Sequence, residues 1–342
     1  MNYEIRRLTW EEAESGWRGL ESDGYIGLPY LCYDWASIWW RHYGRPPREL
    51  FLLGAFADRR MVGLLPLFLE EMRLKNLFAV CRVLKIIGAR EFSYNDLILV
   101  DRDRETVAAA LARHLCRNYP RLVIDFHDLR PDSHVVSLLA RQTRGWRKII
   151  KDHHCPYISL NKGWDGYVSS LGRRTRKNIR QITARLAGQE GLAIELSTDT
   201  RYAEDLFNLH RRRWGMDPED PKLARLEAYE KEVIEMLSRK GWLRMFVNKI
   251  GGRCAAVLWA YDHHGVRYFH KIGFDEGLSC FSPGTALMVQ AVKEAMERGL
   301  REYDFLRGAE AYKLALTKEM RTCYRLVAAG RWPPYLLYRI LS

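Results

Sequence analysis

The alternation of apolar and polar residues predicts the same succession of elements twice along the chain. Residues 105–126 (ETVAAALARHLCRNYPRLVIDF) and 284–305 (GTALMVQAVKEAMERGLREYDF) align without a gap. Each segment combines the apolar spacing of a helix, a proline or glycine that ends it, and a short strand that finishes in Asp-Phe. We therefore predict a helix followed by a strand in both segments.

A hairpin is predicted upstream of each segment. The first, LFLLGAFADRRMVGLLPLFLE, turns near Asp58 and Arg59, and the second, LRMFVNKIGGRCAAVLWAYDH, turns at Gly251 and Gly252. Two glycines between alternating strands are a strong hairpin signal, because the central turn positions need a positive φ. The run GVRYFHKIGFD continues the second sheet. Two matches in the same order indicate a tandem duplication.

The repeat divides the chain of 342 residues into two predicted domains. The second half begins at DHHCPYISLNKGWDGY, so we place the domains at residues 1–155 and 156–342. Antiparallel hairpins combined with a helical crossover predict an α+β fold in which each domain is a mixed sheet with flanking helices. The turn before the first repeated helix, VDRDRET, is acidic and lacks glycine. We therefore expect the first domain to be degenerate, with a structural or acceptor-binding role.

A basic stretch, SLGRRTRKNIRQITARLAGQEG, opens the second half. Ile179, Ile182 and Leu186 have the spacing of one helix face, so we predict an amphipathic helix that shows its cationic side chains on the other face. The simplest interpretation is a solvated face. The functional interpretation is a rim that attracts an anionic substrate, with Arg174 and Lys177 as substrate-binding residues. The stretch contains no aromatic residue, which disfavours nucleic-acid binding.

The overall composition limits which classes of binding partner and which cellular compartment we expect for the protein. A formal net charge of +13 favours anionic partners, such as phosphorylated cofactors, acidic glycans or an anionic membrane surface. Seven scattered cysteines without a CxxC spacing argue against a disulfide framework or a zinc site. The histidine pairs at 153–154 and 263–264 lack partners at metal-ligand spacing, so no metal is predicted. The N-terminus has no apolar signal segment, so we expect a cytoplasmic protein, with peripheral contact at the inner membrane surface as an option. The sequence does not indicate an oligomeric state.

The segment FSPGTALM is the candidate cofactor-binding turn. Ser282, Pro283, Gly284 and Thr285 lead into a predicted helix, and small residues there expose backbone N–H groups at the helix N-terminus. Those donors and the helix dipole favour an anion such as a phosphate. The alternative is a plain helix start, with Ser282 or Thr285 as the N-cap.

The segment YDFLRGAEAYK is the second candidate site. Asp304, Arg307, Tyr312 and Lys313 combine a carboxylate, a phenol and two cations, which can deprotonate a nucleophile and stabilise charge, with Arg307 also a candidate for substrate binding. The alternative is an Asp–Arg pair that ties the strand end, with the tyrosine in the core.

His270, in the strand YFHKIGFD, is a further candidate base. It alternates with Lys271 along the strand, so the two side chains are expected on opposite faces. A histidine that simply packs within the sheet is the alternative.

The motifs SLGRRTRKNIRQ, LFNLHRRRWG, FSPGTALM and YDFLRGAEAYK, in this order, resemble the acetyltransferase-like family of bacterial cellulose and exopolysaccharide gene clusters. That family is a branch of the GNAT superfamily related to the Fem peptidyltransferases. The resemblance covers about residues 150–330, and LCYDWASIWWRHYG and GLLPLFLE are similar to the less regular N-terminal domain of the same proteins. The turn FSPGTALM resembles the pyrophosphate-binding turn of GNAT enzymes, with one glycine where two or three are common.

The resemblance implies two GNAT-like domains in tandem and acyl transfer from acyl-coenzyme A to an amine or hydroxyl acceptor, in exopolysaccharide or envelope assembly. One alternative is a Fem-like transferase that uses aminoacyl-tRNA, although the chain shows no sustained heptad segment for the coiled-coil arm that such proteins often carry. The other alternative is a non-catalytic scaffold that binds a glycan or a protein.

Overall fold

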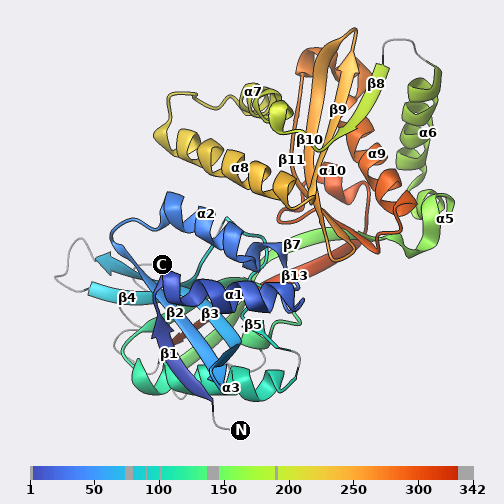
Figure 1. Cartoon of the computed structure of the whole chain (residues 1–342). Helices are drawn as coiled ribbons and strands as arrows, with labels where there is room; N and C mark the ends of the chain where they lie inside the picture. Colours follow the sequence, from blue (N-terminus) through green and yellow to red (C-terminus); the bar gives the residue numbers. More distant parts are fainter. Residues whose placement is uncertain are drawn as a thin grey trace. The chain divides into compact units, whose positions relative to one another are not determined.

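The computed structural model describes residues 3–73, 80–89, 91–100, 102–136, 146–188 and 192–329. The chain forms two compact units (Figure 1). The first holds the described residues up to His153 together with those from Arg321 onward, and the second runs from His154 to Met320. The predicted second domain extended to residue 342, whereas residues 321–329 belong to the first unit. The physical reason is strand pairing, because Leu326 pairs with Phe126 and is fully buried.

The first unit is a mixed sheet with helices on both faces. Its elements are β1 (Glu4–Leu8), α1 (Trp10–Ser22), α2 (Tyr33–Tyr43), β2 (Arg48–Ala57), β3 (Arg60–Arg73), β4 (Val80–Ile86), β5 (Ile98–Leu99), α3 (Arg104–Asn118), β6 (Val123–Leu129), the first part of β7 (Trp146–Ser159) and most of β13 (Glu319–Ala329). The strand order is β1-β2-β3-β4-β6-β13-β7, and β4 and β6 run parallel. Helices α1 and α2 cover one face, and α3 covers the other (Figure 1).

The second unit repeats this plan. Its elements are the end of β7, α5 (Gly163–Ser170), α6 (Arg173–Gly188), β8 (Leu192–Ser197), α7 (Ala203–Trp214), α8 (Pro221–Arg239), β9 (Leu243–Ile250), β10 (Arg253–His263), β11 (Val266–Phe274), the 3-10 turn η5 (Glu276–Phe281), α9 (Pro283–Glu297), β12 (Glu302–Asp304) and α10 (Ala311–Leu314). The strand order is β7-β12-β11-β10-β9-β8, and β11 and β12 run parallel. Helices α7 and α8 cover one face, and α5, α6 and α9 cover the other (Figure 1).

The internal duplication is visible in the boundaries of the elements. Helices α3 and α9 each have 15 residues and begin and end at equivalent positions of the gapless alignment. Both lead into a strand that runs parallel to an earlier strand of the same unit. Both predicted hairpins form, with turns at Asp58–Arg59 and Gly251–Gly252 that all have positive φ. The predicted α+β class, with mixed sheets and flanking helices, is therefore confirmed.

All seven cysteines are free thiols. Within the described part of the chain, no helix combines the length and the apolar character that crossing a bilayer requires.

Candidate functional site

Helix α9 begins with an N-terminus that its own side chains do not cap. Its N-cap residue, Ser282, has left-handed backbone angles (φ 52°, ψ 48°) and makes no side-chain capping hydrogen bond. The Ser282 N–H donates to Ser279 O at 2.9 Å, and Pro283 has no N–H. Of the four predicted cofactor-binding residues, Gly284 and Thr285 are therefore the two whose N–H groups have no acceptor within the described part of the chain and can bind an anion.

A cavity of about 220 Å³ lies at this helix start. It is lined by Arg213, Ile272, Phe274, Ser279, Ser282, Pro283, Gly284, Thr285, Met288 and Tyr312. Arg213, from the last turn of α7, is the one cationic side chain among these described lining residues. Its guanidinium stacks on the Phe274 ring at 4.3 Å from the centroid, which holds the charge over the cavity wall. The cavity thus combines a helix N-terminus, a guanidinium and an apolar floor.

Strand β11 borders this cavity and changes its pairing along its length. Its parallel pairs with β12 end at Tyr268 and Asp304, whereas its antiparallel pairs with β10 continue to Phe274. The register with β10 shifts at His270, which is the extra residue of a β-bulge. Strand β11 therefore pairs with β12 only at its beginning, over residues 266–268. The bulge at His270 lies beyond these pairs, so its backbone makes no ladder pair with β12.

The bulge corrects the expectation that His270 and Lys271 point to opposite faces. Both reach Glu230 of α8: the Lys271 ammonium forms an ion pair with it, and His270 Nε2 lies 3.5 Å from its Oε1. An extra residue in the strand breaks the strict alternation of side chains, so two consecutive side chains share one face. Strand alternation alone could not reveal this, because the bulge depends on pairing with β10.

His270 packs within the sheet and does not line the cavity. Its ring lies on Trp259, with centroids 3.9 Å apart. Burial lowers the pKa of His270, and the nearby Glu230 carboxylate offsets this only in part. Burial also raises the pKa of Glu230, but Lys271 and His270 hold it below its usual value overall. At neutral pH this cluster is an ionised Glu–Lys pair beside a neutral imidazole.

Three of the predicted catalytic residues, at the end of β12 and after it, do not line the α9 cavity. Asp304 is fully buried, and its Oδ1 accepts from the Leu306 N–H at 2.7 Å, where the chain turns with a positive φ. The buried ammonium of Lys313 donates to Arg307 O at 2.7 Å and pairs with Glu310. Neither side chain lines the cavity, and the half-buried Arg307 does not line it either.

Tyr312 is the one predicted catalytic residue that lines the cavity. Burial raises the pKa of its phenol, and the carboxylate of Glu310 raises it further. The phenol is therefore protonated at neutral pH, so it can donate a proton or a hydrogen bond but cannot act as a base. Its position next to the helix start of α9 makes it the candidate general acid of this site.

Helix α6 carries the predicted basic face. Ile179 and Ile182 are buried and Arg174 and Lys177 are exposed, as the helical spacing predicts; Leu186 lies among the residues whose side chains the structure does not describe. Arg176 belongs to the predicted cationic face but is only half-exposed, because its guanidinium donates to the backbone oxygens of Ser169 and Leu171 at 2.9 and 2.8 Å. Lys177 lines an open groove between α5 and α6, separate from the α9 cavity.

Two residues of the site escaped the sequence analysis. Arg213 was part of the motif LFNLHRRRWG, but only the fold shows which of its three consecutive arginines faces the cavity. Gly273 lets α7 approach β11, because a Cβ there would lie 2.8 Å from the backbone N of His210. A glycine within a strand was the available signal for such a close approach.

Comparison with known proteins finds a family similarity within the second unit. A family model described as "Acetyltransferase (GNAT) domain" matches residues 173–314, which span α6 to α10. No curated protein matches the chain.

Solved structures match over both units. A crystal structure of FemX aligns with a TM-score of 0.64 at 13% identity and covers 99% of both chains. L-PGS from Bacillus licheniformis aligns with a TM-score of 0.56 at 12% identity, covering 98% of this chain and 97% of its own. A tandem GNAT protein from the clavulanic acid biosynthesis pathway aligns with a TM-score of 0.51 at 14% identity, covering 97% of this chain and all of its own (100%). At these identities the likeness establishes the fold.

Proposed function

We propose that the chain transfers an acyl group from an acyl-coenzyme A donor to an amine or hydroxyl acceptor. The observation that carries the proposal is the α9 cavity, in which an uncapped helix N-terminus, the Arg213 guanidinium and the Tyr312 phenol meet. The match of residues 173–314 to a GNAT acetyltransferase domain supports the same activity.

The donor's phosphates would bind at the start of α9. The N–H groups of Gly284 and Thr285 supply hydrogen bonds, the helix dipole supplies a partial positive charge, and Arg213 supplies a full one. The apolar floor formed by Ile272, Phe274 and Met288 accepts the uncharged parts of the donor. A cavity with a positively charged helix start and an apolar floor suits a molecule with a phosphorylated end and an uncharged arm.

The reaction would proceed by direct attack of the acceptor on the thioester carbonyl. A backbone N–H in the bulged part of β11 would stabilise the oxyanion as the carbonyl carbon becomes tetrahedral. The new C–N or C–O bond forms, the C–S bond breaks, and the Tyr312 phenol gives its proton to the leaving thiolate. The proton lost by the acceptor returns through solvent to the tyrosinate. No acyl-enzyme is needed, because holding both reactants in place lowers the barrier by itself.

The acceptor is proposed to be a glycan or an amine, used in exopolysaccharide or envelope assembly. Arg174 and Lys177 are exposed on α6 and would attract an acceptor that carries negative charge. An anionic membrane surface at the cytoplasmic side would bind the same cationic face.

Calorimetric titration with acetyl-coenzyme A tests the donor, and release of free thiol in the presence of amines and amino sugars tests the transfer. Saturable binding with one donor per chain is the expected result. RNA that co-purifies with the protein, together with no binding of acetyl-coenzyme A, would favour an aminoacyl-tRNA donor instead. Absence of both would leave a non-catalytic scaffold.

A further inference from the structure

The structure assigns a divalent metal site to the first unit, with Asp128, Asp152 and His153 as ligands. Asp128 lies at the end of β6, and the other two residues are consecutive on β7. One ligand atom of each residue lies within 4.8 Å of the other two. This site is distant in sequence from the α9 cavity and independent of the proposed acyl transfer.

The distances between the ligand atoms suit one small cation. His153 Nδ1 lies 3.5 Å from Asp128 Oδ1 and 3.6 Å from Asp152 Oδ2. Zinc binds nitrogen and carboxylate oxygen at about 2.0–2.2 Å, so two ligands of a tetrahedral zinc lie about 3.3–3.5 Å apart. Three protein ligands would leave the fourth position for water or another donor.

The surroundings of His153 direct its Nδ1 at the two carboxylates. Its Nε2 lies 3.3 Å from Ser93 O, so Nε2 carries the hydrogen and donates it to that carbonyl. A neutral ring presents the Nδ1 lone pair to both carboxylates, which is repulsive unless a cation lies between them, whereas a protonated ring would donate to one of them. A backbone carbonyl that fixes the tautomer of a ligating histidine is a recurrent feature of metal sites.

The side chains behind the ligands hold them in place. Asp152 Oδ2 accepts from the Asp128 N–H at 3.3 Å and lies 3.2 Å from His127 Nδ1. His127 Nε2 in turn faces Asp125, which pairs with Arg325 at 2.7 Å. Carboxylates oriented in this way need little rearrangement to bind an ion.

Charge balance sets the valence of the ion. The cluster contains three carboxylates (Asp125, Asp128 and Asp152), one guanidinium (Arg325) and two imidazoles (His127 and His153), so two positive charges are needed for neutrality. One divalent cation supplies them with both rings neutral, and two imidazolium ions supply them without a metal. Protonation of both rings is therefore the rival interpretation.

A buried amide beside the cluster favours the metal. Asn95 donates its backbone N–H to Asp128 O at 2.8 Å and is fully buried. Among the described residues, neither its side-chain Oδ1 nor its Nδ2 has a hydrogen-bond partner. Buried amides are almost always partnered, and an amide oxygen is a suitable further donor to a divalent cation.

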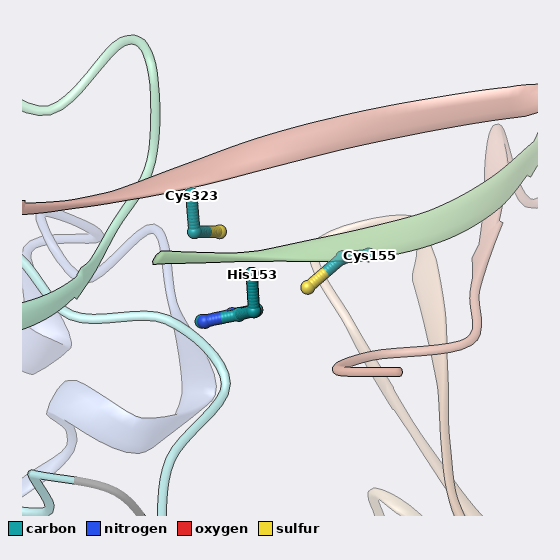
Figure 2. Close-up of side chains that lie close together, drawn as sticks. All are labelled: His153, Cys155 and Cys323. Carbon is teal, nitrogen blue, oxygen red and sulfur yellow. The ribbon is translucent and has the colours of Figure 1, made fainter. Parts of the chain in front are cut away.

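Sequence spacing did not reveal the site. The histidines at 153–154 have no partner at metal-ligand spacing in the sequence, because Asp128 lies 25 residues upstream of His153 and becomes its neighbour only through the fold. Figure 2 shows His153 and Cys155 on β7 and Cys323 on β13, which is next to β7 in the strand order. The thiol of Cys323 faces the same Ser93 carbonyl, at 4.0 Å, so a thiolate ligand is the alternative that the test must separate.

The test uses the full chain, stripped with a chelator and titrated with Zn²⁺ and, separately, with Co²⁺. We expect one tightly held metal per chain by elemental analysis, a higher unfolding temperature with Zn²⁺, and Co²⁺ d–d bands without thiolate charge transfer. His153→Gln and Asp152→Asn should weaken Zn²⁺ binding more than about tenfold. Asp132→Asn, at an exposed acid of the same unit, and Cys323→Ser should leave it unchanged.

Three outcomes would overturn the assignment. They are no stoichiometric metal in the wild-type chain, a strong thiolate-to-Co²⁺ charge-transfer band, and equal Zn²⁺ affinity of the ligand variants and the wild type. If the ligand variants do not fold, the metal content and Co²⁺ spectrum of the wild-type chain decide the question.

Discussion

The starts of helices α3 and α9 have the same backbone and opposite chemistry. Both helices follow an N-cap residue in the left-handed region, Asp103 at φ 62° and Ser282 at φ 52°, and neither cap makes a side-chain hydrogen bond. Around α3 the chain places the carboxylates of Asp103 and Glu105. Around α9 it places small residues and Arg213. The two helix starts share their backbone geometry, and in the proposed function their side chains decide which of them accepts a phosphate.

The cavities beside the two helix starts differ in the same way. Asp103 lines a cavity of about 430 Å³ together with Asp58, Arg60 and Arg102, so acids and bases are mixed there. The α9 cavity contains no carboxylate among its described lining residues. An anionic ligand would therefore meet carboxylates as well as cations at the first site, and no carboxylate among the described lining residues of the second.

The largest expected effect is that of a carboxylate introduced at the start of α9. Thr285→Asp should weaken binding of acetyl-coenzyme A by more than about 100-fold, because the new charge would lie at the proposed phosphate position. The helix should still form, since acidic residues are favourable in a first turn. Thr106→Asp, the equivalent change in α3, is the matched control and should leave binding unchanged. Calorimetry measures the affinity of both variants for acetyl-coenzyme A. Equal weakening by the two changes would contradict the claim that only the start of α9 binds the donor.

A charge introduced at Gly284 would test the same site less cleanly, because it would also disturb the packing. Gly284 is buried, and a Cβ there would lie 2.8 Å from Cδ1 of Phe274. A side chain at this position would displace the ring on which Arg213 stacks. The packing therefore does not tolerate an acid at this position.

Removal of the Tyr312 hydroxyl should affect the rate of acyl transfer and leave donor binding intact. Tyr312→Phe keeps the ring and removes the proton donor, so kcat should fall by about 10- to 100-fold while the Kd of the donor stays within about twofold. Steady-state kinetics and calorimetry separate the two effects. An unchanged kcat would exclude the phenol as the general acid.

The stability of the chain should depend on pH through His210, which donates its Nδ1–H to Ile272 O at 3.2 Å and so fixes α7 on β11. Burial, reinforced by Lys271, lowers the pKa of His210 to about 4. The unfolded chain takes up this proton near pH 6.5 and the folded chain only near pH 4, so the free energy of unfolding should decrease by about 3 kcal/mol as the pH falls through this window.

His210→Asn keeps a donor to the carbonyl and removes the titration. Its free energy of unfolding, measured by denaturant titration at pH 7.5 and pH 4.5, should therefore change less with pH than that of the wild type. Parallel pH profiles for the two proteins would contradict the assignment.

The smallest expected effect is the loss of the Arg213 charge. Arg213→Ala should weaken donor binding by about fivefold, because a half-exposed guanidinium contributes about 1 kcal/mol to an anion site. Arg212→Ala, which removes an exposed neighbouring charge, should change binding by less than twofold at moderate salt. Affinities measured at two salt concentrations would distinguish a local contact from the general effect of net charge.

The sequence predicted the parts of this account that depend on local pattern. The repeat of hairpin, helix and strand, the turns at 58–59 and 251–252 and the start of α9 all follow from apolar spacing and turn residues. Side-chain roles that depend on tertiary contacts could not be predicted. Lys313 is buried against the backbone of Arg307, His270 lies in a bulge, and Arg213 reaches the cavity only because α7 packs on β11.

The most direct test of the central claim is hydrogen–deuterium exchange of the whole chain with and without saturating acetyl-coenzyme A. The account predicts that the ligand slows exchange in peptides covering residues 282–288 and leaves peptides covering residues 103–109 unchanged. Protection at the start of α3, or no protection at the start of α9 despite measurable binding, would contradict it.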